Sequence, residues 1–299
     1  MDNEILTRYE KLVQKRMPYL RRAQQCSALT VPSLIPPDNM QGQELPTPFQ
    51  GTGARGVRTL ASKLLLTLFP PSTTFFKITN TEKIKKTASP KDVQDLDGAL
   101  AVMEFNVTAE MNKMFIRSAA FEVIRHLIVG GNGLMSFFGD KVKVFPLSQY
   151  VVARDCEGNP YDIIIKESLG FSTLPPEVQR AIQAKTSGKD SAAKLDEDVD
   201  IYTRALLTNR GGKAVWRVSQ ECMGVAIQAS EGTYPEKKLP FLPLRWTRID
   251  NEDYGRGLVE EYLGDLAGVD SLAKSLQELA EISAKCNYLV KPGGMTDKD

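Results

Sequence analysis

The sequence predicts an α+β protein: a helical N-terminal half, then antiparallel strands, then a long helix near the C-terminal end. Three observations predict this order. Apolar residues recur every three or four positions between residues 5 and 128, fall in short runs bounded by turn residues between 134 and 229, and return to helical spacing between 257 and 285. With 299 residues, 42% of them hydrophobic, the chain is long enough to bury a sizeable core.

The first predicted helix covers residues 5–17, after which Pro18 permits only a kink or a restart. Five prolines then fall within residues 31–48, which is too many for regular structure. This stretch is either an extended arm over a surface or a neighbouring subunit, or a solvated linker, and both interpretations stay open.

Three more helices are predicted before the strands begin. Residues 57–68 place their apolar side chains in one stripe and end at two prolines. Ser89 is a predicted N-cap, followed by Pro90 at the first helical position, for a helix with one long apolar face. Ser118 begins the third helix, and a pair of glycines at 130–131 ends it.

Strand-like runs begin at residue 134, and the first four of them are expected to form an antiparallel meander. The predicted strands cover residues 134–138, 141–145, 150–155, 161–166, 199–207, 214–218 and 225–229. A short helix over 175–182 and a polar, mobile stretch over 185–198 are expected among them.

Residues 257–285 are predicted to form one long helix, about 43 Å in length, that needs partners outside itself. Its six acidic residues and two lysines give it a net charge of −4. Four of the acids share one face of a straight helix, namely Glu260, Asp270, Glu278 and Glu281. That face is either an ordinary solvated surface or the lining of a channel. Gly264 and Gly268 form a G-x-x-x-G pair, which either admits a neighbouring helix or marks a local bend.

Composition argues against several function classes. Lysine and arginine total 38 against 37 aspartates and glutamates, so no global basic field holds nucleic acid by counterion release. The four cysteines form no C-x-x-C pair and His126 is the only histidine, so neither a metal nor a cofactor is expected. No stretch approaches the roughly 18 apolar residues that span a bilayer, and a reducing cytoplasm is the expected compartment.

One motif suggests an alternative function. Residues 51–56 read GTGARG, which matches G-x-G-x-x-G at the start of a helix, so a nucleotide-binding enzyme has to be considered. In a dinucleotide fold this turn follows a buried strand, whereas here it follows Pro46, Pro48 and Phe49. The favoured interpretation is structural: the glycines allow close backbone contact where the helix begins.

Ten blocks along the chain are together more specific than any single motif. They are RAQQC (22–26), VPSL (31–34), TPFQGTGARG (47–56), LASKL (60–64), LFP (68–70), LSQYVVARD (147–155), GTYP (232–235), PLR (243–245), YGR (254–256) and EEYLGDL (260–266). In these blocks, and over its whole length, the chain resembles the portal proteins, or head-to-tail connectors, of short-tailed podophages of the Autographiviridae kind.

The resemblance implies a structural subunit and not an enzyme. Residues 1–256 would be the wing, 257–285 the first stem helix and 286–299 the start of the clip, where the chain is expected to be truncated. Twelve copies would form a ring at one capsid vertex of the virion, assembled in the host bacterial cytoplasm. The partners would be the major capsid protein, terminase, a tail adaptor protein and double-stranded DNA passing through the channel, with no membrane. The four acids named above would then face the DNA.

Overall fold

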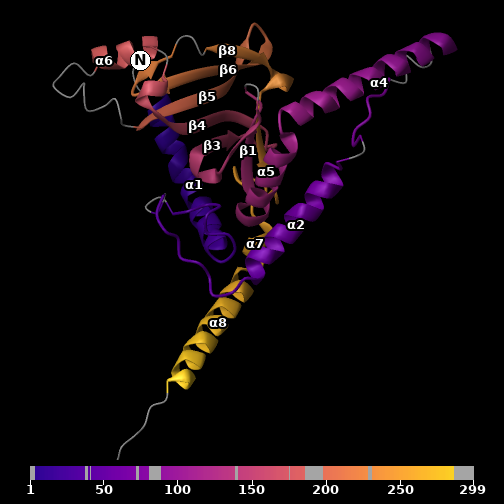
Figure 1. The fold of residues 1–299 in the computed structure, drawn as a ribbon. Coiled ribbons are helices and arrows are strands. Elements are labelled where there is room, and N and C mark those ends of the chain that lie inside the picture. The colour runs from indigo at the N-terminus through magenta and orange to yellow at the C-terminus, as the bar shows by residue number, and fades with distance from the viewer. Residues whose placement is uncertain are drawn as a thin grey trace, which may run out of the picture.

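The computed structural model describes residues 4–37, 40, 42–71, 74–80, 89–138, 141–174, 176–185, 198–227 and 231–285 (Figure 1). Helices fill most of the N-terminal half, antiparallel sheets follow, and a long helix comes last, which confirms the predicted α+β class. The helices are α1 (Glu4–Ala28), α2 (Thr52–Leu68), α4 (Pro90–Lys113), α5 (Ile116–Gly130), α6 (Pro176–Lys185), α7 (Leu258–Glu261) and α8 (Leu263–Ala284).

The described strands form two antiparallel sheets. Their bounds are β1 (Asn132–Ser136), β2 (Lys143–Phe145), β3 (Tyr150–Arg154), β4 (Pro160–Gly170), β5 (Asp198–Arg210), β6 (Lys213–Cys222), β7 (Val225–Ala226), β8 (Gly232–Pro235) and β9 (Phe241–Arg245). The smaller sheet has the order β2-β1-β9, and the larger has the order β3-β4-β5-β6-β7, with β8 also pairing with β6. The predicted single meander is therefore wrong between β2 and β3, because β1 and β2 form their sheet with β9, from much later in the chain.

Two of the predicted helix ends are confirmed, while the predicted start at Ser118 is wrong, because Ser118 lies inside α5, which begins at Ile116. Ser89 caps α4 by accepting a hydrogen bond from the backbone N–H of Asp92, and Gly131 ends α5 in the left-handed conformation at φ 71°. Of the two alternatives predicted at Pro18, a kink or a restart, the restart is wrong, because α1 continues through this residue. Pro18 is exposed, so water can bond the carbonyl that loses its partner. The predicted mobile stretch 185–198 lies largely, and the predicted clip segment 286–299 wholly, outside the described residues.

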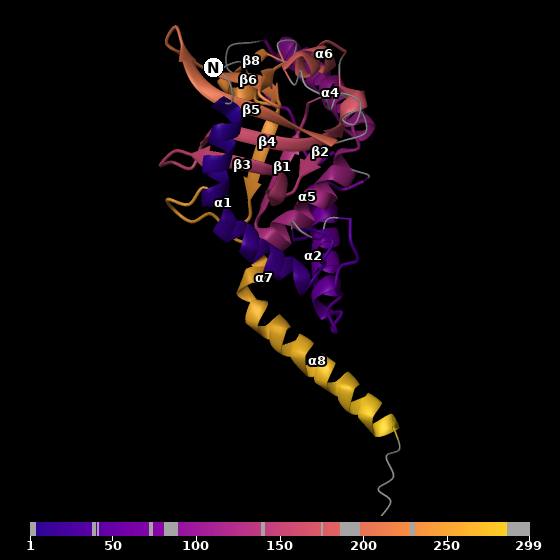
Figure 2. The same ribbon diagram turned by 90° about the vertical axis from the view of Figure 1, so that its left-hand side faces the viewer.

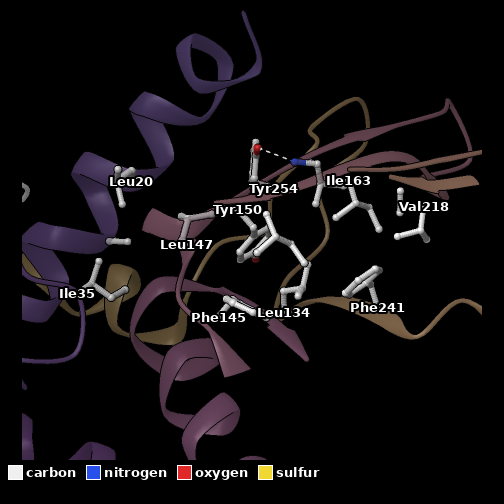
Figure 3. Close-up of a cluster of buried hydrophobic side chains, with 14 of the residues drawn as sticks. Leu20, Ile35, Leu134, Phe145, Leu147, Tyr150, Ile163, Val218, Phe241 and Tyr254 are labelled. Atoms are coloured by element: carbon white, nitrogen blue, oxygen red, sulfur yellow. Dashed lines mark hydrogen bonds between the residues drawn. The ribbon is translucent and has the colours of Figure 1, made fainter. Parts of the chain in front are cut away.

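The core lies on both faces of β3, which is why this strand is almost entirely buried. Val151 and Ala153 pack with Leu12 of α1 on one face. Tyr150 and Val152 point the opposite way, as the two-residue period of a strand requires, into the space between the two sheets. Figure 3 shows that second cluster, which includes Leu20, Leu134, Phe145, Leu147, Ile163, Val218 and Phe241.

The outer edge of β3 is closed by the segment that leads to the C-terminal helices. The Tyr254 hydroxyl accepts a hydrogen bond from the Val152 N–H at 3.0 Å (Figure 3). The Asp253 Oδ1 accepts one from the Arg154 N–H at 2.8 Å. Unpaired N–H groups on an edge strand are a template for unwanted pairing. These two side chains remove that template and tie the later segment to the larger sheet.

A buried ion cluster fastens α1 to the larger sheet. Asp162 of β4 is 0% exposed and accepts hydrogen bonds from two arginines. The Arg8 Nε of α1 lies 2.8 Å from it, and Arg204 of β5 binds it through both Nε and Nη2, at 2.9 and 3.0 Å. Such a carboxylate needs both partners, because burying a charge without compensation costs several kcal/mol.

Candidate assembly interface

The helix α8 projects from the folded body, and only its first turns lie near other elements (Figures 1 and 2). Its large apolar side chains are open to solvent, with Leu272 and Leu276 each 67% exposed and Leu279 60% exposed. Within the described part of the chain nothing covers them. Exposed apolar side chains gathered in this way are typical of a surface that packs against further protein.

The side chains of α8 sort into three faces at 3.6 residues per turn. Val269, Leu272, Leu276 and Leu279 fall within an arc of roughly 80°, which we call the apolar stripe. Glu278 and Glu281 lie on the opposite side of the helix. Gly264 and Gly268 lie between the two, and a Cβ added to either would meet nothing within 4 Å among the described atoms, so there is room for a neighbouring helix.

The predicted single helix over 257–285 is two helices, which meet at Tyr262. The last turn of α7 ends with a hydrogen bond from the Tyr262 N–H to the Val259 carbonyl, which spans three residues instead of the four of an α-helix. Tyr262 has φ −106° and ψ 10°. The helical periodicity continues across this break, because Val259, Leu263 and Leu266 pack on the same cluster of α2 and α5. The sequence pattern therefore could not show it.

The base of α7 is held by close backbone contacts with the start of β1. The Asn132 side chain is buried and pairs with Gly255 as a strand would, donating to its carbonyl and accepting from its N–H, both at 2.7 Å. A Cβ on Gly131 would lie 2.2 Å from the Arg256 carbonyl carbon. Sequence reasoning missed Asn132, since its partner is 123 residues away and no motif marks it.

Glu260, one of the four predicted channel acids, lies on α7 and binds arginines of its own chain. It accepts from Arg22 of α1 at 3.2 Å and from Arg256 at 3.0 Å, and its side chain is only 16% exposed. Arg256 also binds Glu252 at 3.1 Å. Arg22, Arg256 and Glu260 border a cavity of about 440 Å³ between α1 and the segment before α7. Glu260 therefore joins α7 to α1.

Asp270, the second predicted channel acid, accepts a hydrogen bond from the Gln50 backbone N–H at 3.3 Å. Among the described residues, no such contact joins the other two acids to another element: Glu278 lies 3.9 Å from Lys274 of the same helix in an exposed pair, and Glu281 is exposed. The structure thus brings Glu278 and Glu281 together on one open face of α8. It places Glu260 and Asp270 against the body.

The glycine motif at residues 51–56 forms the start of α2, where the protein itself occupies the position of a phosphate. The Gln50 side chain accepts from the Gly53 N–H at 2.9 Å, as a bound anion would at a helix N-terminus. A Cβ on Gly53 would lie 2.6 Å from the Leu29 carbonyl oxygen. At Gly53 the geometry therefore supports the structural interpretation, since the Gln50 side chain takes the N–H that a phosphate would bind. Gly51 and Gly56 are exposed, and a Cβ at either would meet no described atom closer than 4.0 Å.

His126 is buried on α5, and its Nδ1 has no hydrogen-bond partner among the described atoms. Burial, reinforced by nearby Arg125, lowers the pKa of His126 from its ordinary 6.5 to about 4. A neutral, enclosed imidazole of this kind serves packing and does not shuttle protons.

We expect this histidine to make the protein acid-sensitive. Between pH 6.5 and 4 the unfolded chain binds a proton that the folded chain rejects, so stability falls as pH drops through this window, by about 3 kcal/mol when complete. Urea unfolding of wild type and His126→Leu at pH 7, 5.5 and 4 measures it. The variant should lose less stability on acidification, and equal losses in both proteins would contradict the assignment.

The described residues include no group of three histidine, cysteine, aspartate or glutamate side chains placed to hold a metal ion. Among the helices in those same ranges, none combines the length and apolar character needed to cross a bilayer.

The fold and this surface define a class: an α+β protein with a long helix whose apolar side chains are open to solvent. Residues 2–298 match the family described as bacteriophage head to tail connecting protein. The chain is 35% identical over 297 residues to the portal protein of Escherichia phage T7, 36% over 296 to that of Enterobacteria phage T3 and 34% over 297 to that of Enterobacteria phage SP6. It belongs to the bacteriophage head-to-tail connecting protein family. These alignments cover 96–97% of the chain but 54–56% of the relatives, so the chain spans about half their length.

Proposed function

We propose that the chain is part of a subunit of a portal ring at one capsid vertex of the virion. Twelve copies surround a channel for double-stranded DNA during packaging and ejection, after assembly in the host cytoplasm. The observation that carries the proposal is the match to three portal proteins over nearly the whole chain. Major capsid protein, terminase and a tail adaptor protein are the proposed partners.

The exposed apolar stripe supports a ring, because copies that pack side by side can cover it. Gly264 and Gly268 would let the neighbouring helix approach closely. Residues 1–256 then form the wing, α7 and α8 the first stem, and residues 286–299 the start of the clip. Negative-stain electron microscopy of the full-length protein tests the proposal: rings with a central hole support it, and a monodisperse monomer contradicts it.

We propose further that the open acidic face of α8 is turned toward the DNA. Of the four acids predicted to line the channel, Glu278 and Glu281 carry this proposal, since Glu260 and Asp270 are engaged within the chain. Carboxylates repel phosphates, whereas rows of lysine or arginine would bind them in a salt-dependent way. An acidic lining therefore lets DNA slide.

Replacing both Glu278 and Glu281 with lysine should leave rings intact and slow DNA packaging, because each added cation attaches to phosphates that pass it. Raising the ionic strength should restore part of the rate. Packaging assays with complemented phage at two salt concentrations measure both effects. The control, Glu278→Gln with Glu281→Gln, removes the charges without adding cations and should package near the wild-type rate; wild-type rates with both lysines would contradict the proposal.

A further inference from the structure

Gln50 connects three helices through its own polar groups. It is 6% exposed, and its Nε2 donates to the Leu29 carbonyl just beyond the end of α1 at 2.7 Å. Its Oε1 accepts from the Gly53 N–H at the start of α2, and its backbone N–H donates to Asp270 of α8. No sequence motif indicates this role, because a single glutamine forms no recognisable pattern and its partner Asp270 is 220 residues away.

Close packing between the end of α1 and the start of α2 fixes the position of Gln50. The start of α2 and the end of α1 are already at contact distance, since a Cβ on Gly53 would lie 2.6 Å from the Leu29 oxygen and 3.0 Å from the Thr30 methyl carbon. The hydrogen bonds of the Gln50 side chain span this contact. Any group that binds the Gln50 backbone is therefore bound to the rigid body and not to a loose loop.

A second contact joins α8 to Phe49, the residue before Gln50. Lys274 lies one turn after Asp270 on the same face of α8, and its Nζ lies 5.7 Å from the centre of the Phe49 ring. Asp270 and Lys274 thus hold the consecutive residues Phe49 and Gln50. From Lys274 onward every described residue of α8 is exposed, so this is the last point at which α8 touches the body.

A contact at this point affects the direction of the whole of α8, because α8 is separated from α7 by the break at Tyr262. From that break to Ala284 the helix is ~33 Å long at 1.5 Å per residue. A swing of about 10° at the break would move the far end by ~6 Å. The apolar contacts of Leu263 and Leu266 hold only the first turn.

We infer that Asp270 and Lys274, bound to Gln50 and Phe49, form a brace that sets the direction of α8 relative to the body. Asp270 is in this view a positioning residue. The brace is a property of the subunit alone, while its consequence, equal inclination of all stem helices around a channel, rests on the proposed function.

Spin labels can test the brace in the full-length protein, mixed with an excess of unlabelled copies. The labels replace exposed Gln14 of α1 and exposed Ser283 of α8, with Cys156 and Cys286 changed to serine. The test variant is Asp270→Ala with Lys274→Ala. The control is Asp265→Ala with Lys285→Ala, which removes the same charges from α8 at positions outside the brace. Pulsed electron paramagnetic resonance then gives the distance distribution between the labels.

Wild type and control should give one narrow distribution, and the test variant should give a broadened one or one displaced by several ångströms, with an unchanged melting temperature. Asp270→Asn keeps an oxygen acceptor and should retain the narrow distribution. Identical distributions in test variant and control would overturn the brace. The outcome is independent of ring formation: if microscopy shows no rings but the distributions differ as expected, the brace stands and the proposed function fails.

Discussion

Asp162→Ala is expected to lower the free energy of unfolding by about 3–5 kcal/mol, which is a large part of the stability of a typical domain. The substitution leaves Arg204, whose side chain is 13% exposed, without its two hydrogen bonds, and it detaches Arg8 of α1 from the larger sheet. The cost is mainly that of a guanidinium left buried and unpaired. Chemical denaturation followed by circular dichroism measures it.

Asp200→Ala is the matched control for this experiment. Asp200 is also an aspartate of the larger sheet in an ion pair, with Lys166 at 2.8 Å, but both side chains are more than a third exposed. Solvent screening limits such a pair to about 1 kcal/mol or less. If both variants lost the same stability, the buried cluster would not hold α1 in place as described.

Leu276→Asp is expected to abolish ring assembly and leave the subunit folded. Leu276 is the middle of the apolar stripe and is 67% exposed, so a carboxylate there costs the monomer little. In a ring the same carboxylate would be buried against apolar atoms at every subunit contact, at several kcal/mol each. Sedimentation velocity of the full-length variant should show monomers. Gln277→Asp places the same charge one residue away, off the stripe, and should still form rings.

A mixing experiment shows how the stripe is covered. In a ring the two contact surfaces of each subunit differ, so the apolar stripe of one copy must meet another surface of the next. If that surface contains Gly264 and Gly268, then Gly268→Leu blocks assembly as well. An equimolar mixture of Leu276→Asp and Gly268→Leu proteins should then form dimers, because one intact stripe meets one intact glycine surface. A mixture that stays monomeric would mean that the glycines face something else.

The sequence predicted those features of the fold that depend on neighbouring residues. Ser89 with Pro90 marked the start of α4, and Gly131 marked the end of α5, because capping chemistry is local. The division into two sheets was not predictable, since β9 contains Pro243, which weakens a strand signal, and pairs with β1 about 100 residues earlier.

The candidate interface shows the same difference between local features, which the sequence predicted, and long-range features, which it did not. The apolar stripe and the acids of α8 were visible as periodicity, because a helix repeats every 3.6 residues whatever surrounds it. Which acids are free was not visible: Glu260 meets Arg22 and Asp270 meets Gln50 across more than 200 residues of sequence. Long-range partners of this kind depend on the tertiary fold, and a single sequence does not encode them as a pattern.

The pairing of β1 with β9 has a consequence for how the chain is made. A ribosome adding roughly 5–20 residues per second needs on the order of 5–20 s to pass from Ser136 to Phe241. During that interval one edge of β1 has no partner, and the Asn132 amide has no Gly255 to bind. Since open strand edges promote aggregation, the N-terminal half depends during synthesis on its helices to shield that edge. The chain is thus vulnerable until β9 emerges, and slow translation between β8 and β9 would lower the yield of soluble protein.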